Sequence, residues 1–193
     1  IEKIVGSNAD SVVIIDEAYI DFGGQTALPL IEKYDNLLIV RTFSKSRSLA
    51  GLRVGYAMGN ELLIKAMNDV KFSINSYTMN APSIQLGIAS IKDDAYFRKT
   101  IKQVRETRDY TAENLKSNNF MVLDSAANFV FARHVRHSAV DIFNELKKAR
   151  IYVRHFNSAR INNYLRITIG TQEEMEKFFK ELKVILTDLG SRF

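Results

Sequence analysis

The chain has 193 residues, of which 46% are hydrophobic and 25% charged, and its 27 basic and 22 acidic side chains leave a net charge of +5. This composition is ordinary for a globular chain of one or two domains. The absence of cysteine excludes disulfides and thiolate metal sites, and no apolar run approaches the ~20 residues that span a bilayer. The basic residues are scattered, so we expect no nucleic-acid partner, no membrane association and a cytoplasmic location.

The first half of the chain alternates short apolar runs with helical patterns. Strands are predicted over apolar, β-branched runs: residues 11–15, 37–40 and 54–59. The first run is apolar almost throughout, which is typical of a parallel strand buried on both faces. Residues 1–10 are typical of the end of an amphipathic helix that stops at Gly6. Further helices are predicted over residues 28–34 and 60–70 and in the segment that begins at Pro82. Residues 71–80 are polar and are expected to be irregular.

The second half begins with a long predicted helix over residues 93–117, whose basic side chains alternate with acidic ones as on a solvent-exposed face. Strands are predicted over four further runs: residues 120–123, 128–132, 151–153 and 164–170. Helices are predicted over residues 139–149 and from a capping box at Thr171 to Leu189. The histidines lack metal-ligand spacing, so we expect no metal site, and we expect His134 and His137 to be ordinary surface residues.

The most informative stretch follows the second strand, where hydroxyl groups, one lysine and small residues form a polar turn. Thr42 and Ser44 precede Lys45, and Arg53 follows eight residues later. A lysine just past a buried strand is costly unless it has a partner or a chemical role. Hydroxyls, backbone N–H groups and a forked guanidinium together are suited to binding a phosphate. The alternative for Lys45 alone is a solvent-exposed turn capped by serines.

Residues 42–51 read Thr-Phe-Ser-Lys-Ser-Arg-Ser-Leu-Ala-Gly, and Leu-Arg-Val-Gly follows. This run resembles, position by position, the signature around the cofactor-bearing lysine of class-II pyridoxal-phosphate (PLP) aminotransferases, and with Leu-Arg-Val-Gly it is similar to the histidinol-phosphate aminotransferase family. The resemblance implies that Lys45 is catalytic and holds PLP as a Schiff base. It also implies that Thr42, Ser44 and Arg53 bind the cofactor phosphate.

Two residues at the end of the first strand extend this resemblance. In open α/β sheets, ligands bind beyond the carboxyl ends of the strands, which is where Asp16 is expected. The resemblance places Asp16 against the pyridine nitrogen of PLP, which a carboxylate keeps protonated. It makes Tyr19 a hydrogen-bond donor to the ring oxygen O3′. The alternatives are a strand-end turn carboxylate for Asp16 and a half-buried packing tyrosine for Tyr19.

A second set of candidate residues lies near the C-terminus. In the alternating stretch 164–170, the three apolar side chains face one way and Arg166 faces the other. An arginine that points from a strand toward a cleft is able to bind a carboxylate through two parallel hydrogen bonds. The resemblance makes Arg166 the anchor of the substrate carboxylate, with Arg154 helping to bind a phosphate or second carboxylate. The alternative is a surface arginine paired with an acid.

The expected fold class is α/β: part of the large domain of a fold-type-I PLP transferase, a mostly parallel sheet with helices, plus a small C-terminal α+β domain. We expect residues 1–92 to belong to the large domain, 93–118 to form an interdomain helix and 119–193 to form the small domain. The resemblance covers nearly the whole chain but only the C-terminal portion of the family's chain. We therefore expect a fragment that is not a competent transaminase alone.

The resemblance implies PLP-dependent transamination between histidinol phosphate or imidazole-acetol phosphate and glutamate or 2-oxoglutarate, in histidine biosynthesis. The partners would be a small-molecule amino donor and a phosphorylated or 2-oxo acid acceptor, and the full-length protein would be a homodimer. Two related activities remain open: another fold-type-I aminotransferase, such as an aromatic one, and a threonine-phosphate decarboxylase. Outside enzymes, the alternative is a module that binds anions or a partner protein through its basic residues.

Overall fold

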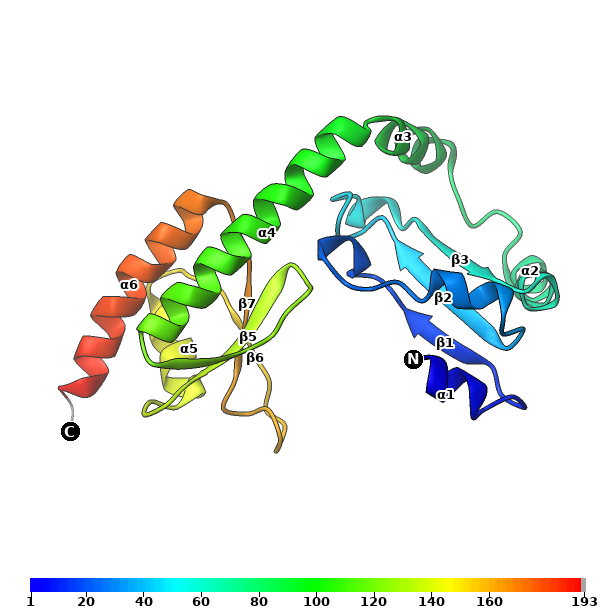
Figure 1. Ribbon diagram of the computed structural model, residues 1–193. Helices are drawn as coiled ribbons and strands as arrows, with labels where there is room; N and C mark the ends of the chain where they lie inside the picture. The colour runs from blue at the N-terminus through cyan, green and yellow to red at the C-terminus, as the bar shows by residue number, and fades with distance from the viewer. Residues whose placement is uncertain (192–193) are drawn as a thin grey trace. The chain divides into compact units, whose positions relative to one another are not determined.

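The computed structural model describes residues 1–191 and divides into two compact units, Ile1–Lys99 (unit 1) and Thr100–Phe193 (unit 2). Each unit has its own β-sheet (Figure 1). Each also has its own cluster of buried hydrophobic side chains. No helix within residues 1–191 combines the length and the apolar character that crossing a bilayer requires.

Unit 1 contains a three-stranded sheet in the order β1-β2-β3, formed by Val13–Asp16, Leu37–Thr42 and Gly55–Gly59. Strands β1 and β2 are parallel, with Asp16 opposite Val40, whereas β2 and β3 are antiparallel. The short helix α1 (Glu2–Gly6) and the 3-10 turn η2 (Leu28–Glu32) pack on one face of this sheet. Because β1 and β2 run in the same direction, their carboxyl ends lie at one edge of the sheet.

The expectation that the first strand is buried on both faces is wrong within unit 1. Val13 and Ile15 are half-buried, but Ile14 between them is 60% exposed. The reason is that α1 and η2 cover only one face. Of the two later helices of unit 1, α2 (Glu61–Ile74) buries no residue, and α3 (Ala81–Lys92) buries only small ones.

Two helical elements of unit 1 differ from their predictions. The segment expected as a helix over 28–34 forms the 3-10 turn η2. Its proline lies in the first turn, where a backbone N–H would have no hydrogen-bond partner within the helix. Helix α2 continues past Val70 into the segment expected to be irregular, because no glycine or proline interrupts it. It ends where the backbone N–H of Asn75 bonds to the carbonyl of Lys71.

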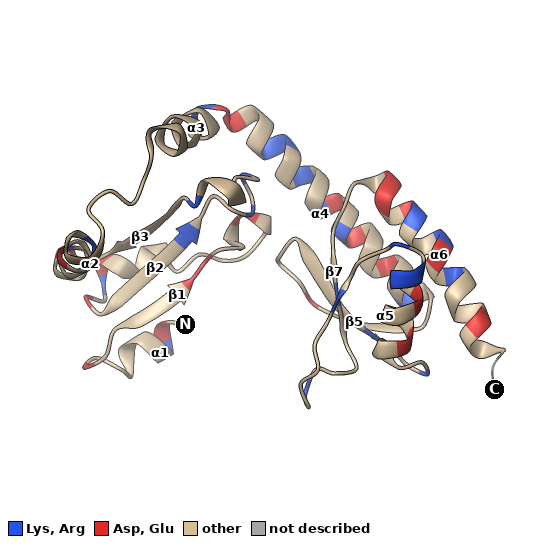
Figure 2. Ribbon diagram, turned by 180° about the vertical axis from the view of Figure 1, so that it is seen from behind, with Lys and Arg blue, Asp and Glu red and all other residues tan. Residues whose placement is uncertain are grey.

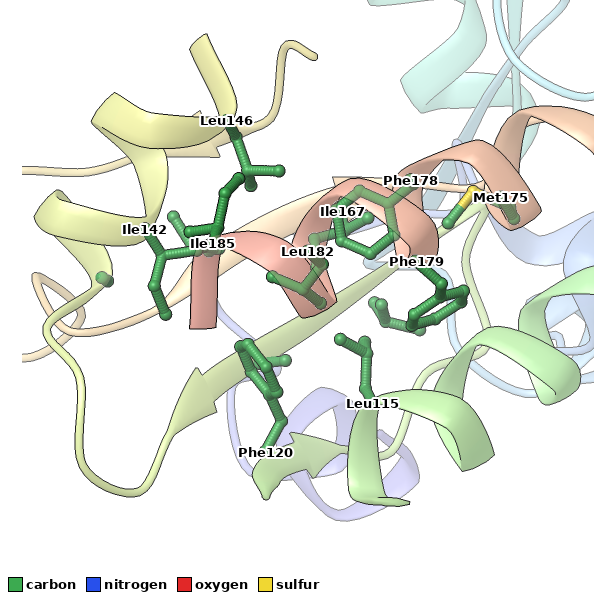
Figure 3. Close-up of a cluster of buried hydrophobic side chains, with 14 of the residues drawn as sticks. Leu115, Phe120, Ile142, Leu146, Ile167, Met175, Phe178, Phe179, Leu182 and Ile185 are labelled. Carbon is green, nitrogen blue, oxygen red and sulfur yellow. The ribbon is translucent and has the colours of Figure 1, made fainter. Parts of the chain in front are cut away.

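Unit 2 contains a four-stranded antiparallel sheet in the order β4-β5-β7-β6, formed by Phe120–Leu123, Phe129–His134, Leu165–Thr168 and Arg154–His155. Its helices are α4 (Asp94–Ser117, which begins in unit 1), α5 (Ala139–Lys148) and α6 (Gln172–Gly190). Apolar side chains from all three helices converge with those of the sheet in one buried cluster, in which Leu182 of α6 is fully buried (Figure 3).

The strands of unit 2 alternate as predicted. Leu165, Ile167 and Ile169 are buried on the helix side, which leaves Arg166 on the open side of the sheet. The strand predicted over 151–153 begins only at Arg154. The reason is that the N–H of Ile151 bonds to the carbonyl of Leu146 and so belongs to the end of α5 rather than to the sheet. The capping box at Thr171 is confirmed.

Candidate active site

The lysine loop, residues 43–54, connects β2 to β3 and carries Lys45 on its exposed side. The Nζ atom of Lys45 lies 5.4 Å from the centroid of the Tyr19 ring. Asp16 ends the neighbouring parallel strand, so it lies at the same edge of the sheet. The Oδ1 atom of Asp16 accepts a hydrogen bond of 2.9 Å from the N–H of Ala18, which orients the carboxylate. The structure therefore brings an exposed amine, an aromatic ring and a carboxylate to one sheet edge.

The hydroxyl residues beside Lys45 form a connected set. The hydroxyl of Thr42 lies 2.9 Å from the Oγ atom of Ser44 and accepts the N–H of Ser44 at 3.0 Å. It also lies 3.3 Å from the carbonyl oxygen of Val54, which directly follows Arg53. Arg53 adopts the left-handed conformation, with φ of 56°, and its Nη1 atom donates to the carbonyl of Ala50 at 3.1 Å.

This donor set fits PLP. Within residues 1–191, the Arg53 guanidinium forms no ion pair, so it and the hydroxyls of Thr42 and Ser44 are suited to a phosphate. The Lys45 amine suits the aldehyde of the cofactor, and Asp16 suits a protonated ring nitrogen. In the described part of the chain, no three His, Asp or Glu side chains gather at a metal-binding distance.

The residues that follow Lys45 are held in place, although Lys45 itself is exposed. The hydroxyl of the buried Ser46 donates to Oδ2 of Asp21 at 2.5 Å, which ties the loop to the turn after β1. The Nη1 atom of Arg47 donates to the carbonyl of Ser90 at 2.6 Å. These contacts restrain the loop backbone, while the lysine side chain stays accessible.

Helix α3 supports the same loop through small residues. The hydroxyl of Ser83 donates to the carbonyl of Leu52 at 2.9 Å. A Cβ atom placed on Gly87 would lie 3.7 Å from the ring of Phe43, an ordinary contact distance. Both small residues are buried, and their spacing places them one turn apart on one face of the helix. The loop backbone therefore packs closely against α3.

A buried ion pair next to Asp16 was not predicted from the sequence. The carboxylate of Glu17 accepts hydrogen bonds from Nε and Nη2 of Arg41 at 2.9 and 2.8 Å, from the hydroxyl of Thr26 at 2.9 Å and from the N–H of Ala27 at 2.6 Å. Burial lowers the pKa of Arg41, but the hydrogen bonds with Glu17 and Tyr56 outweigh it and raise that pKa overall. Strand alternation could have predicted the burial of Glu17. Its side chain falls on the same face as Val13 and Ile15, the half-buried residues of β1.

The two predicted substrate-binding arginines belong to unit 2. Arg154 of β6 lies directly opposite Arg166 of β7. The Arg166 guanidinium lies 5.3 Å from the ring centroid of Phe129 and 5.8 Å from that of Phe156, and the Arg154 guanidinium lies 5.4 Å from that of Phe156. In residues 1–191, neither arginine forms an ion pair. Within the described residues, the alternative of a surface arginine paired with an acid therefore does not apply to Arg154 or Arg166.

The expectation that His134 is an ordinary surface residue is wrong. Strand β5 extends two residues beyond its predicted end, and this places His134 at a buried position, 5% exposed. Its Nδ1 atom accepts the N–H groups of Arg136 and His137 at 3.1 and 3.0 Å. Burial lowers the pKa of His134, and the nearby charges of His137 and Arg136 lower it further. The ring therefore acts as a neutral acceptor that closes a turn.

The family model described as aminotransferase class I and II matches residues 1–182. A histidinol-phosphate aminotransferase of Brachyspira hyodysenteriae is 52% identical over 187 residues, which are 96% of this chain and 53% of the relative. The solved histidinol-phosphate aminotransferases of Clostridium acetobutylicum and Sinorhizobium meliloti, the latter in complex with pyridoxal-5'-phosphate, are each 25% identical, with TM-scores of 0.88 and 0.85. They cover 97% of this chain, and the matches cover 58% and 53% of theirs.

These likenesses confirm the expected α/β fold class of the fold-type-I PLP enzymes. The chain spans about half the length of the curated relatives it matches, as the 53% coverage of the Brachyspira protein illustrates. The matched residues 1–182 include the lysine loop with Lys45. The chain therefore belongs to the class I and II aminotransferase family.

Proposed function

We propose that this chain takes part in PLP-dependent transamination between histidinol phosphate and 2-oxoglutarate. The observation that carries the proposal is the exposed Lys45 amine at the carboxyl end of β2, 5.4 Å from the centroid of the Tyr19 ring. Membership in the aminotransferase family supports the reaction type, and the names of the relatives support the substrate. The substrates are then an amino donor and a 2-oxo or phosphorylated acceptor.

Lys45, Asp16 and Tyr19 have distinct roles in this proposal. When bound, PLP supplies an electron sink that stabilises negative charge on the substrate carbon. Lys45 binds the cofactor through its amine and, once the substrate has displaced it, moves a proton at its Nζ atom. The Asp16 carboxylate holds a proton at the pyridine nitrogen, and the Tyr19 hydroxyl donates a hydrogen bond to the ring oxygen.

The remaining predicted residues bind anionic groups. Thr42, Ser44 and Arg53 hold the cofactor phosphate through hydroxyl and guanidinium donors. Arg166 binds the substrate carboxylate, and Arg154 binds the phosphate or second carboxylate. Guanidinium groups accept either anion in the same planar geometry. Such a pair suits an enzyme that alternates between a phosphorylated and a dicarboxylic substrate.

Cofactor attachment is tested on the chain itself. The chain is incubated with PLP, reduced with borohydride and digested, and the labelled lysine is identified by mass spectrometry. We expect label on Lys45 at PLP concentrations that leave Lys65 and Lys71 unlabelled, although both of these belong to the exposed helix α2. The Lys45→Arg variant, which retains the charge, should lose the label. Equal labelling of all three lysines would contradict the proposal.

Catalysis is tested in a chimera, in which this chain replaces the matching 187 residues of the Brachyspira hyodysenteriae relative. We expect amino transfer from histidinol phosphate to 2-oxoglutarate, and its loss in the Lys45→Ala chimera. Faster transfer from an aromatic amino acid would identify the aromatic alternative, and release of carbon dioxide from threonine phosphate would identify the decarboxylase. A folded chimera with none of these activities would leave only an anion-binding role.

We also propose that the complete enzyme is a cytoplasmic homodimer. Support for a partner surface comes from α2 and the segment after it, where Leu62, Ile74 and Tyr77 are 76%, 80% and 92% exposed. Exposed apolar side chains concentrated in one segment are typical of a surface that binds another polypeptide. Light scattering of the chimera should give the mass of two copies. A monomer at micromolar concentration would contradict the dimer.

A further inference from the structure

The open side of the unit 2 sheet is positively charged without compensation. We call it the arginine face; it consists of the side chains of β5, β7 and β6, and of the residues next to them, that point away from the helices: Phe129, Phe131, Arg133, Arg154, Phe156, Tyr164 and Arg166. No Asp or Glu occurs in residues 125–140 or 146–172. On α4 and α6, by contrast, acidic and basic residues are interspersed (Figure 2). A surface of one sign attracts ligands of the other.

Two cations on this face are direct neighbours. Arg154 and Arg166 occupy opposite positions of adjacent strands, an arrangement in which like charges destabilise a sheet. The Nε atom of Arg166 is buried and has no hydrogen-bond partner in residues 1–191. A buried donor without a partner is rare in folded proteins and calls for a specific explanation. An anionic ligand would both offset the repulsion and satisfy unpaired donors.

Phe156 contacts both cations. The two guanidinium groups lie 5.4 and 5.8 Å from the centroid of its ring, within the ~6 Å reach of cation–π attraction. A cation–π contact uses none of the hydrogen-bond donors of a guanidinium, so its N–H groups stay available to a ligand. A carboxylate at the same place would consume those donors. The ring thus holds the two cations without blocking what they bind.

We infer that Phe156 is a positioning residue, whose ring holds Arg154 and Arg166 as a pair that binds one ligand with two negative charges. The ligand class is a phosphate monoester or a dicarboxylate. The inference rests on the proposed function for the substrate-binding role of the two arginines, and it goes beyond that function by making Phe156 the residue that positions them. Because both guanidinium groups are already fixed, little side-chain conformational entropy is lost when a doubly charged ligand binds.

The test compares doubly and singly charged probes on the 193-residue chain. Dissociation constants for glutarate, glycerol 2-phosphate and butyrate are measured from the NMR signals of the arginine Nε–H groups. Phe156→Met retains an apolar side chain of similar length but removes the ring. We expect it to weaken glutarate and glycerol 2-phosphate binding roughly tenfold, from the loss of two cation–π contacts, and butyrate binding by about twofold. Phe156→Tyr should restore both affinities.

The matched control is Tyr152→Leu, which removes an exposed ring two residues before Arg154. In residues 1–191, the rings in cation–π range of the two arginines are those of Phe129 and Phe156. It should change no affinity. A second variant, Arg154→Lys, retains the charge at an exposed position but loses the planar fork, so the ratio of butyrate to glutarate dissociation constants should fall. Unchanged glutarate affinity in folded Phe156→Met, or an unchanged ratio in Arg154→Lys, would overturn the inference. Labelling of Lys45 reports on the proposed function separately.

Discussion

The buried ion pair beside Asp16 provides the sharpest test of how unit 1 is stabilised. The Glu17 side chain is 3% exposed, and that of its partner Arg41 is 19% exposed. Glu17→Ala would leave the guanidinium, the Thr26 hydroxyl and the Ala27 N–H without the oxygen atoms that they now contact. Removing one partner of a buried pair costs about 3–5 kcal/mol. Since Arg41 retains some access to water, we expect a loss near the lower end, about 3 kcal/mol.

The assay is unfolding in urea, monitored by hydrogen exchange with mass spectrometry, which gives the free energy of unfolding of each unit separately. Asp69→Ala is the matched control, because it breaks the Lys65–Asp69 pair, whose distance of 2.6 Å is similar but whose side chains are 72% and 62% exposed. An exposed pair of this kind contributes at most about 1 kcal/mol. A Glu17→Ala loss no larger than the Asp69→Ala loss would refute the reasoning that burial, rather than distance, decides the magnitude.

Three further changes have defined outcomes. Leu182→Ala, in the centre of the unit 2 core, should cost about 2–5 kcal/mol of unfolding free energy, whereas Val184→Ala on the exposed side of α6 should cost much less. Because the pKa of His134 is lowered in the folded chain, the unfolded chain binds more protons below about pH 6.5, so stability should fall on acidification, and the fall should be smaller in His134→Asn. Ser46→Ala removes the hydrogen bond to Asp21 and should cost about 1 kcal/mol, measured as faster hydrogen exchange in the lysine loop.

The features that could be predicted from the sequence are local ones. Lys45 and its hydroxyl neighbours are contiguous, so their pattern is visible without knowledge of the fold. The orientation of Arg166 follows from strand alternation, because the buried residues on either side of it determine which way it points. The capping box at Thr171 likewise lies within one helical turn.

The features that could not be predicted depend on residues distant in sequence. Ser46 and Asp21 meet because the loops after β1 and β2 emerge at the same sheet edge. The exposure of Ile14 depends on what packs against the second face of the sheet, and the apolar character of the strand carries no information about that. The burial of His134 is a local exception, because it depended only on where β5 ends, two residues beyond its predicted end.

Arginines in strands of the two units show why partner identity matters more than residue type. Arg41 is held by the Glu17 carboxylate, which uses its donors and makes it a structural cation. Arg154 and Arg166 are held by aromatic rings, which fix their positions but leave in-plane donors unused. From sequence, all three are basic residues in or beside apolar strands. The distinction arises because β1 brings an acid to Arg41, whereas the segments around β5, β6 and β7 contain no acid at all. The absence of a neighbouring acid is therefore what makes a strand arginine available to a ligand.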